Sequence, residues 1–531
     1  MRSARFPDFR TTSFLAVLLA TLITPMAILA GWFQMPKVKE PVIPSRIVSL
    51  ADFGGSPDGK TLNTEMIANA IHSLAKKGGG KLVIPPGIWL TGPIRLENNI
   101  NLHLEEGALV QFASDIKQYP PVTFDLKGEK ETRLMSPIFG ENLQNVAITG
   151  RGVFDGAGEA WRPVKKSKMT ERQWKDLLAS GGVLEAKGDM WWPSEEARKD
   201  RRPVMLKLVN CRKGLLEGVT FQNSPAWNLN PTLCEDLTIR NVTVRNPWYS
   251  QNGDGLDLEH CRNVILRGSR FDVGDDAICL KSGANERGRR IGAPTENVLV
   301  EDCIVYHGHG GFTIGSEMSG GVRNIRVNNC VFMGTDVGLR FKSTRGRGGV
   351  VENIYISNVR MTDIPTEAIG FNMYYGGQAP LDDNGELTVA DRKEVPVSEE
   401  TPQFRDIYIE NVICRGAQTA VLLQGLPEMP IRGIHLRNVS ITAQTGMAWM
   451  EAENIICENM EILNRKGAVL NLFHAKNSVI DHLTYLPDAE TVIKAKGEGS
   501  SGVVIKNTNM KAAAKDFTLT SGASADAFKV E

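Results

Sequence analysis

The sequence predicts an all-β chain folded as a single-domain, right-handed parallel β-helix with an N-terminal capping helix. Three observations support this fold. A short apolar pattern recurs along most of the chain, and no helical crossovers separate its copies. The 52 glycines among 531 residues indicate a protein that is rich in turns. Short β segments that recur in this way are typical of a solenoid in which each coil buries its face against the next.

The repeat is an apolar-x-apolar pair followed within two or three residues by Asn, Asp or Gly and a second alternating pair. Copies such as "NVILRGSRF", "NVLVEDCIV" and "NIRVNNCVF" begin roughly 20 to 35 residues apart, with two longer gaps. Their first apolar residues are Val146, Leu237, Val264, Val298, Ile325, Ile354, Ile407, Ile434 and Ile455. A β-sandwich or propeller would need regular Asn-Gly or Asp-Gly hairpins, which the sequence lacks. Stacked parallel coils are therefore favoured.

The capping helix is predicted within "EMIANAIHSLAKK", where Asn63 or Thr64 can serve as the N-cap. Apolar residues with helical spacing form one stripe, and three glycines end the pattern at residues 78–80. A helix at this position would cover the open end of a solenoid. The domain is predicted to run from residue 31 to 531, with loop insertions over one face at about 156–203 and 376–402.

Residues 1–30 are typical of an export signal. Arginines precede an apolar run from Phe14 to Ala30, and Ala30-Gly31 offers a cleavage point. A retained N-terminal anchor is the alternative, although the run is short for a membrane span. We expect an exported protein, periplasmic or secreted, without stable membrane insertion unless the signal is retained.

Eight cysteines in an exported chain invite a disulfide interpretation. Their positions favour free thiols instead. Cys303 in "VEDCIV" and Cys330 in "VNNCVF" occupy equivalent places in two repeats, where a small buried thiol can pack in a row. No two cysteines have the CxxC spacing of a metal site. We expect no metal and no cofactor.

The charges balance, with 61 Lys plus Arg against 61 Asp plus Glu. No global field therefore attracts nucleic acid or an anionic membrane. An anionic substrate must be bound by a local cluster of basic residues. We expect a monomer with no nucleic-acid partner.

Aligning the inward residues of consecutive coils brings distant polar residues together. The pairs that align are Leu256-x-Leu258, Ile278-x-Leu280, Phe312-x-Ile314 and Leu339-x-Phe341. In this register Asp254 is level with Asp276, and Asp275 is level with His309. Because neighbouring coils lie about one strand spacing apart, the three carboxylates form one site.

Three carboxylates at one site cannot ionise independently, because like charges raise each other's proton affinity. One is expected to stay protonated as an acid while the others remain bases, which is the division that glycosidic hydrolysis requires. On the next coil Arg340 and Lys342 alternate outward on the same face.

Four segments in this order, "NGDGLD", "GDDAICLKSG", "GHGGFTIGS" and "RFKST", resemble the signature segments of the polygalacturonase family, glycoside hydrolase family 28. The stretch "DFGGSPDGKTLNTEMIANAIHSLAKKGGGKLVIPPGIWLTGPIRL" is similar to the start of pectin-active enzymes with the pectin-lyase-like solenoid. The resemblance extends from about residue 48 to about 485. It departs from the family at Gly253, where Thr is usual.

The resemblance implies an inverting hydrolase. Asp275 would be the general acid that protonates the leaving oxygen, while Asp254 and Asp276 would hold and deprotonate the attacking water. His309 would tune the protonation of the acid by hydrogen bonding. The substrate would be a pectic polysaccharide or an oligogalacturonide.

The resemblance also implies that Arg340 and Lys342 bind the sugar carboxylate, Arg bidentately and Lys as a point charge. Tyr374 or Tyr375 is predicted either to stack on the sugar ring or to pack in the fold. Asn252 is grouped with the substrate-binding candidates, although it is expected mainly to orient its turn.

Five further residues are left with two interpretations each. Arg287, Arg289 and Arg290 would either contact substrate carboxylates or form an ordinary exposed loop. Trp191 and Trp192 would either line the sugar cleft or pin the insertion.

Several functions remain open at this stage. The favoured function is hydrolysis of α-1,4-galacturonosyl linkages, in the manner of the bacterial exo-acting type, because the insertion at 156–203 is long enough to wall off a groove. The alternatives are a rhamnogalacturonan-active hydrolase, a calcium-dependent pectate lyase on the same fold, and a noncatalytic carbohydrate-binding solenoid.

Overall fold

The structure is a computed structural model that describes residues 36–199, 202–377 and 392–531. Residues 36–531 form one compact unit. The predicted export segment at 1–30 lies outside the described residues. Among the described helices, none has the length and apolar character needed to cross a membrane.

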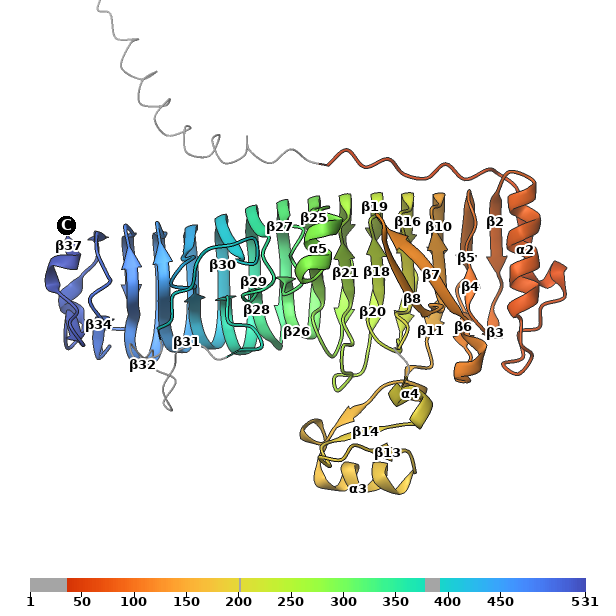
Figure 1. The fold of residues 1–531 in the computed structure, drawn as a ribbon, viewed down its shortest axis with the longest axis horizontal. Coiled ribbons are helices and arrows are strands. Elements are labelled where there is room, and N and C mark those ends of the chain that lie inside the picture. Colours follow the sequence, from red (N-terminus) through yellow and green to blue (C-terminus); the bar gives the residue numbers. More distant parts are fainter. Residues whose placement is uncertain (1–35, 200–201, 378–391) are drawn as a thin grey trace, which may run out of the picture. The chain divides into compact units, whose positions relative to one another are not determined.

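Parallel strands stack in three rows along the chain (Figure 1). The first row consists of β1 (Ile47–Ser49), β2 (Gly80–Ile84), β5 (Ile100–Leu104), β10 (Gln144–Gly150), β16 (Arg212–Glu217), β19 (Glu235–Arg240), β22 (Arg262–Arg267), β25 (Thr295–Glu301), β27 (Val322–Met333), β29 (Val350–Asn372), β30 (Gln403–Gln424), β31 (Ile431–Glu453), β32 (Ile456–Lys476), β33 (Val479–Tyr485), β35 (Val503–Lys506) and β37 (Phe528–Val530).

The second row begins with β3 (Gly87–Thr91), β6 (Ala108–Phe112), β11 (Val153–Asp155), β17 (Thr220–Gln222), β20 (Thr243–Arg245) and β23 (Arg270–Asp272). The third row contains β4 (Ile94–Arg95), β9 (Ile138–Glu141), β15 (Leu206–Val209), β18 (Leu229–Thr232), β21 (Leu256–Glu259), β24 (Ile278–Lys281), β26 (Ile304–Gly315), β28 (Thr335–Lys342), β34 (Thr491–Lys496) and β36 (Phe517–Thr520). From β26 to β32, single long strands such as β29 pass through two or three rows.

The pairing register of the first row confirms the repeat found in the sequence. Val264 pairs with Val298, Val298 with Ile325, and the series continues to Ile434. The structure adds a coil within the long gap after Val146, where Gly214 pairs with both Val146 and Leu237. The apolar pattern misses this coil because glycine occupies its first inward position.

Asparagine recurs in the repeat because the turns require a left-handed backbone. Asn263, Asn297 and Asn324 have φ values of 56°, 56° and 55°, a region that asparagine tolerates better than most residues. Their amides also form a ladder. Asn297 Nδ2 donates to Asn263 Oδ1 at 3.2 Å, and Asn324 Nδ2 donates to Asn297 Oδ1 at 3.3 Å.

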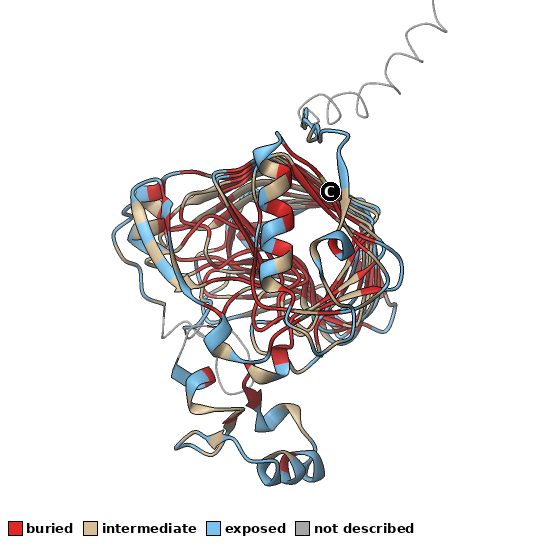
Figure 2. Ribbon diagram, turned by 90° about the vertical axis from the view of Figure 1, so that its right-hand side faces the viewer, coloured by how far each residue is buried: buried red, intermediate tan, exposed pale blue. Residues whose placement is uncertain are grey.

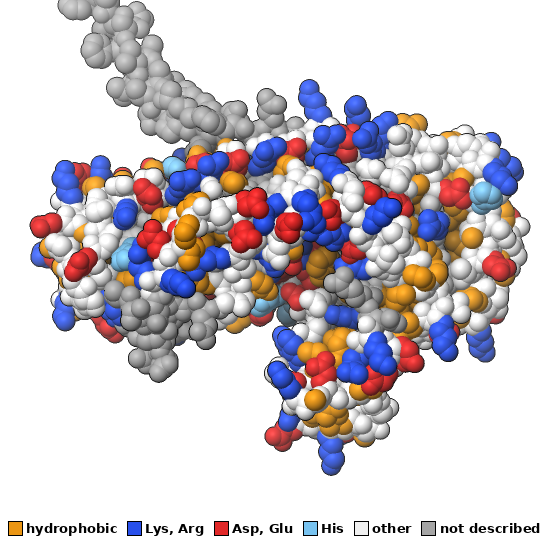
Figure 3. All heavy atoms as spheres, in the orientation of Figure 1, with side chains coloured by type: hydrophobic (Ala, Val, Ile, Leu, Met, Phe, Trp, Pro, Cys, Tyr) orange, Lys and Arg blue, Asp and Glu red, His pale blue; other side chains and the backbone are white. Residues whose placement is uncertain are grey.

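Buried residues from all three rows form one hydrophobic core that runs through the coils. Figure 2 shows the buried residues in red along the stacked strands. All eight cysteines are buried and free, which confirms the prediction of unpaired thiols. On the face shown in Figure 3, acidic and basic side chains are interspersed, as expected for a chain with balanced charge.

A helix forms where the sequence predicts one. Helix α2 (Thr64–Lys76) lies beside β2 and buries Ile67, Ala70, Ile71 and Leu74 (Figure 1). The buried Asn63 precedes it, but its side chain does not cap the helix; its Nδ2 donates to the carbonyl of Leu90 at 3.1 Å. Outside the insertion at 156–203, the other helices of the described residues are η1 (Leu50–Phe53), η2 (Ile116–Gln118), α5 (Asn285–Ile291), η5 (Met510–Ala512) and η6 (Ala525–Ala527).

The insertion at 156–203 is more than a loop. Its described residues form a small antiparallel sheet and four helices, with Val164, Trp174 and Trp191 as their own core. Its elements are η3 (Gly158–Ala160), β12 (Val164–Lys165), η4 (Lys166–Lys168), α3 (Glu171–Ala179), β13 (Val183–Leu184), β14 (Met190–Trp192) and α4 (Glu195–Lys199). Tyr249, from a turn of the main coil, packs against this core.

Two other segments leave the rows. Strands β7 (Pro121–Leu126) and β8 (Glu129–Leu134) form an antiparallel hairpin that the sequence pattern does not predict. The predicted insertion at 376–402 falls largely on residues 378–391, which lie outside the described part of the chain.

Candidate active site

The register of the third row brings the three predicted aspartates together. Leu256 pairs with Ile278, so Asp254 is level with Asp276, and Gly255 N donates to Asp276 O at 2.9 Å. Each of Asp254, Asp275 and Asp276 offers a carboxylate oxygen, and these oxygens all lie within 4.8 Å of one another.

Asp276 is buried and anchored by two cations of the neighbouring coil. Its Oδ1 accepts from Arg340 Nη1 at 2.8 Å, and its Oδ2 accepts from Lys342 Nζ at 2.7 Å. Burial opposes ionisation, but the Lys342 and Arg340 charges outweigh it and lower the pKa of Asp276. Asp276 is therefore an anion at neutral pH.

Arg340 and Lys342 do not lie on an open surface. Both side chains are largely buried, at 11% and 7% exposure. Although burial opposes their charges, Asp276 raises the pKa of each. Their outward direction from the core is as predicted, but they turn toward a carboxylate of the protein itself.

Asp254 differs from Asp276 in its electrostatic surroundings. It is 3% exposed, and its Oδ1 has no hydrogen-bond partner. Burial, together with the charges of Asp257 and Asp275, raises the pKa of Asp254 well above its usual value. Asp254 and Asp276 were both expected to be ionised. The pKa shifts agree with this for Asp276 alone of the two, because Arg340 and Lys342 contact its carboxylate. Asp275 is the one aspartate of the three that is partly exposed.

A buried lysine, which the sequence analysis missed, lies on the other side of the cluster. Lys281 Nζ lies 3.0 Å from Asp257 Oδ1, 3.6 Å from Asp254 Oδ2 and 3.8 Å from Glu317 Oε2. Burial raises the pKa of Asp257 to about 7, against the lowering by Lys281. For Lys281 itself burial lowers the pKa, but Asp257 and Glu317 outweigh it and raise the pKa well above the usual value. The indole of Trp227 covers the ammonium group at 3.8 Å.

His309 lies level with Asp275, as predicted, and its backbone N–H donates to Asp275 O at 2.8 Å. Its side chain does not bond to the predicted acid. His309 Nδ1 instead lies 2.6 Å from Asp336 Oδ2, a residue that the sequence analysis missed. The register that aligned the other site residues would have found it, because Gly308 pairs with Thr335 and Gly310 with Val337.

Tyr374 and Tyr375 lie in different surroundings. The ring of Tyr375 faces Lys342 at 4.7 Å and Arg340 at 5.7 Å, beside the carboxylate cluster. Tyr374 packs against the core and faces Arg345 at 5.8 Å. Of the two interpretations, Tyr375 fits the site and Tyr374 fits packing.

Asn252 occupies the turn before Asp254 with a left-handed φ of 54°. Its Oδ1 accepts a hydrogen bond from Arg202 Nη2 at 2.9 Å. The neighbouring Gly253 has a steric reason to differ from the family pattern, because a Cβ there would lie 1.9 Å from Ser250 Oγ.

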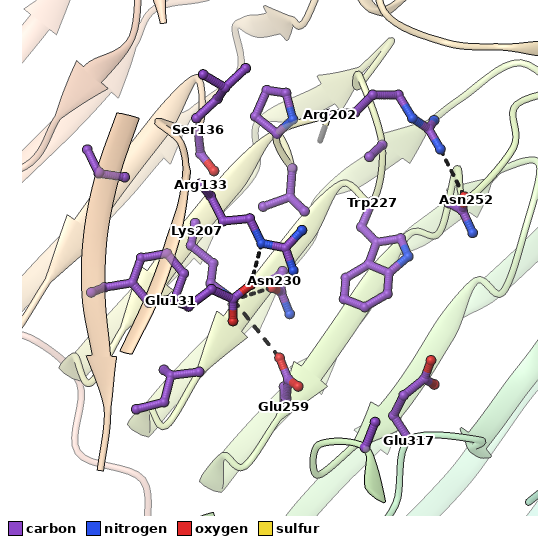
Figure 4. Close-up of a pocket in the computed structure, with 18 of the residues that line it drawn as sticks. Glu131, Arg133, Ser136, Arg202, Lys207, Trp227, Asn230, Asn252, Glu259 and Glu317 are labelled. Carbon is purple, nitrogen blue, oxygen red and sulfur yellow. Dashed lines mark hydrogen bonds and ion pairs between the residues drawn. The ribbon is translucent and has the colours of Figure 1, made fainter. Parts of the chain in front are cut away.

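A cavity of about 650 Å³ reaches Asn252 and Glu317 (Figure 4). It is lined by strands of the third row, the β7–β8 hairpin, α4 and α5. Trp192 lines this cavity, whereas Trp191 is buried in the insertion and donates from Nε1 to Gly181 O at 2.6 Å. Trp192 thus fits the role of lining a cleft, and Trp191 fits the role of stabilising the insertion.

The three arginines of helix α5 have different partners. Arg287 lines the cavity and pairs with Glu131 of β8 at 2.8 Å. Arg290 pairs with Glu129 of the same hairpin at 2.8 Å. Arg289 donates from Nη1 to Gly346 O at 2.8 Å and serves to hold a loop.

A metal ion has one candidate position among the described residues, namely the three aspartates. Carboxylate oxygens are suitable ligands for hard cations such as calcium. However, Arg340 and Lys342 already neutralise Asp276, and Lys281 lies 3.6 Å from Asp254 Oδ2. The resident cations suit a proton-transfer site better than a calcium site.

Comparisons with known proteins agree with the site. Residues 166–466 match the glycosyl hydrolases family 28. A probable polygalacturonase of Vitis vinifera is 32% identical over 403 residues, covering 74% of each chain. An exo-poly-alpha-D-galacturonosidase of Dickeya chrysanthemi is 24% identical over 474 residues, covering 83% of this chain and 75% of that one.

A solved structure shares the fold. The hyperthermoactive exopolygalacturonase from Thermotoga maritima superposes with a TM-score of 0.65 at 33% sequence identity, covering 81% of this chain and 94% of that chain. The matched segment contains every residue of the carboxylate cluster and its cations. On this evidence the chain belongs to glycosyl hydrolases family 28.

Proposed function

We propose that this enzyme hydrolyses α-1,4-galacturonosyl linkages in pectic polysaccharides or oligogalacturonides. The observation that carries the proposal is the cluster of Asp254, Asp275 and Asp276, with one oxygen of each within 4.8 Å, beside buried cations. Such a cluster supplies a proton donor and a base, and the cations favour an acidic sugar. The relatives that are named as polygalacturonases support the same substrate.

In this proposal Asp275 is the general acid, because it alone of the three is partly exposed and can reach a leaving oxygen. Asp276 is the base that activates water, since Arg340 and Lys342 keep it ionised. Asp254 hydrogen-bonds the same water. His309 acts from the next coil with Nδ1 held by Asp336, which leaves Nε2 for the substrate side.

The substrate-binding roles follow from position. Arg340 and Lys342 contribute positive charge near the scissile bond, and Tyr375 offers a ring face beside them. Asn252 acts through its turn and lines the cavity. Tyr374 supports the fold behind these residues.

We expect hydrolysis in the presence of a chelator, with inversion at the anomeric carbon. The carboxylate oxygens lie closer together than the roughly 6.5–9.5 Å carboxyl separation common in inverting enzymes, so the product anomer is the deciding observation. Proton NMR of the first product from polygalacturonate in EDTA is expected to show the β-anomer. Loss of turnover in EDTA, or an unsaturated product, would instead indicate a calcium-dependent lyase.

We expect Arg340→Ala to raise the KM for galacturonides roughly 10-fold or more, since it removes a charge-assisted contact. It is also expected to raise the pKa of Asp276, because Arg340 lowers that pKa in the folded enzyme. The base then protonates at higher pH, and the acid limb of the kcat/KM profile moves upward.

The matched control for Arg340→Ala is Arg323→Ala, whose side chain is 48% exposed and pairs with Glu296 away from the site. Profiles of kcat/KM against pH for both variants test the prediction. If the two variants have the same KM and the same pH profile of kcat/KM, Arg340 does not contact the substrate or tune Asp276.

We also propose that the enzyme releases short products from a chain end. The cavity has walls from the hairpin, α4 and α5, and the Arg287–Glu131 and Arg290–Glu129 ion pairs join α5 to the hairpin. Walls on these sides favour the end of a chain over a polymer that continues past the cavity. The exo-acting relatives support the same mode.

Viscosity of polygalacturonate, followed against reducing ends, tests the mode of attack. An enzyme that acts at chain ends is expected to release mono- or disaccharide early, while viscosity falls slowly. A rapid loss of viscosity at low bond cleavage would show internal cutting. The same measurement of products released from rhamnogalacturonan shows whether the enzyme acts on that polymer instead of polygalacturonate.

Finer points of architecture and location belong to the same proposal. We infer that the coils wind right-handed, that α2 closes the N-terminal end of the core, and that residues 31–531 act as one monomeric domain. The arginines and the apolar run before Ala30 support export to the periplasm or the medium.

A further inference from the structure

The cations predicted to bind the sugar carboxylate are already engaged. Both oxygens of Asp276 are occupied, one by Arg340 at 2.8 Å and the other by Lys342 at 2.7 Å. A substrate carboxylate placed there competes with an anion that the proposed reaction needs. A further cation that no described carboxylate of the protein neutralises would therefore strengthen the recognition of an acidic ring beyond what Arg340 and Lys342 supply.

The cavity that reaches Asn252 and Glu317 has one such cation among the residues that the structure describes. Among the described residues that line it, five basic side chains lie within 4.0 Å of a carboxylate oxygen, and Arg202 does not. The five paired side chains are Arg133 with Glu131, Arg198 and Lys199 with Glu195, Lys207 with Glu259, and Arg287 with Glu131.

Among the residues that the structure describes, the hydrogen-bond partners of Arg202 are all neutral acceptors. Its Nη1 donates to Pro225 O at 3.0 Å and to Gln251 O at 2.8 Å, and its Nη2 donates to Asn252 Oδ1 at 2.9 Å. A guanidinium has five N–H donors, so Nε–H and one Nη2–H remain.

The two remaining donors belong to the nitrogens that bind carboxylates elsewhere in this protein. Arg345 uses Nε and Nη2 to bind both oxygens of Glu428, at 2.6 and 2.8 Å. Arg392 uses the same two nitrogens for Glu451. A planar fork of this kind matches a carboxylate in geometry and charge.

The position of Arg202 also links the cavity to the catalytic turn. Figure 4 shows its guanidinium directed at Asn252, with Trp227 lining the same cavity. Burial and Arg162 lower the pKa of Arg202 to about 10, while Asp254 and Asp275 raise it. Arg202 is therefore still charged at neutral pH and lies within electrostatic reach of two aspartates of the cluster.

We propose that Arg202 binds the carboxylate of a uronic acid ring in this cavity and selects it over neutral or methyl-esterified rings. The inference rests on the proposed function and extends it to a specificity residue supplied at the end of the insertion. Arg202 acts with its Nε and Nη2 edge, while its Nη1 bonds fix the guanidinium in place.

Calorimetric binding of digalacturonate and of its dimethyl ester tests this inference, in an Asp275→Asn background that prevents turnover. With Arg202 intact, the acid is expected to bind more tightly than the ester. Arg202→Met is expected to weaken acid binding about 10- to 100-fold and to leave ester binding nearly unchanged. Arg202→Lys is expected to retain part of the preference, because it keeps the charge but loses the fork.

A purely structural role gives a different result. If Arg202 only holds the turn of Asn252, then Arg202→Met weakens acid and ester equally, and Asn252→Ala reproduces the effect; either finding overturns the inference. An absence of acid preference with Arg202 intact overturns it too. Failure of the intact enzyme to hydrolyse polygalacturonate, with the acid preference still dependent on Arg202, would reject the proposed function and leave the binding role standing.

Discussion

Asp275→Asn is expected to lower kcat on polygalacturonate about 10²- to 10⁴-fold, the range that general acid catalysis contributes. Asparagine keeps the shape of the side chain but has no carboxyl proton to give to the leaving oxygen. The N–H of Asp276 donates to Asp275 Oδ1 at 3.0 Å, and an amide oxygen can accept the same bond. Steady-state kinetics and oligogalacturonide binding are the measurements, and binding is expected to persist.

The leaving group distinguishes an acid from a base. An aryl galacturonide with a weakly basic leaving group needs little protonation, so Asp275→Asn is expected to recover much of its rate on this substrate. The rate of Asp276→Asn is not expected to recover on this substrate, because this variant loses the base that activates the attacking water. Asp272→Asn is the matched control, since Asp272 is 46% exposed, pairs with His307 and lies outside the cluster. A comparable loss in the control, or full activity of Asp275→Asn, would reject the assignment.

Much of the fold could be predicted because its strands repeat. Inward residues recur at each coil, so the series from Val264 to Ile434 appears in the sequence and in the pairing register alike. The coil at Gly214 was missed because glycine lacks the apolar signal. The hairpin β7–β8 was missed because it departs from the repeat. The insertion at 156–203 was predicted, but its own small fold was not, because its core involves a residue as distant as Tyr249.

The catalytic cluster could be predicted for the same reason. Strands β21 and β24 pair in register, so the residues at equal distances before them also lie side by side. Asp254 and Asp276 are level for this reason. The same reasoning would have placed Asp336 beside His309. Arg202 could not be found in this way, since the insertion has no register with the coils.

Protonation states were the least predictable part of the site. Sequence reasoning treats the three aspartates as similar carboxylates that share one proton. In the structure Asp276 has two cations beside it and a lowered pKa, whereas burial and neighbouring acids raise the pKa of Asp254. The difference depends on which face of each carboxylate Lys281, Arg340 and Lys342 occupy, and packing decides that.

Lys281→Met is expected to lower the free energy of unfolding by about 3–5 kcal/mol, as is typical when one partner of a buried ion pair is removed. The lysine is 4% exposed, and the variant leaves Asp257, which is fully buried, without its cation at 3.0 Å. Urea unfolding measures the loss. Lys511→Met is the control, because that lysine is 85% exposed in its pair with Asp516, and little change is expected there.

The loss in Lys281→Met is expected to grow with pH, and its sign follows from Asp257. The pKa of Asp257 in the folded protein is raised from 3.8 to about 7, so between these values the folded state binds the extra proton and stability falls as pH rises. Lys281 is one of the charges that limit this rise; without it the pKa of Asp257 moves higher and the fall continues above pH 7. The double variant Lys281→Met with Asp257→Asn removes both charges and is expected to regain part of the stability, most clearly above pH 7. A loss that is the same at acidic and alkaline pH, or no recovery in the double variant, would show that Lys281 stabilises the fold by packing rather than by its charge.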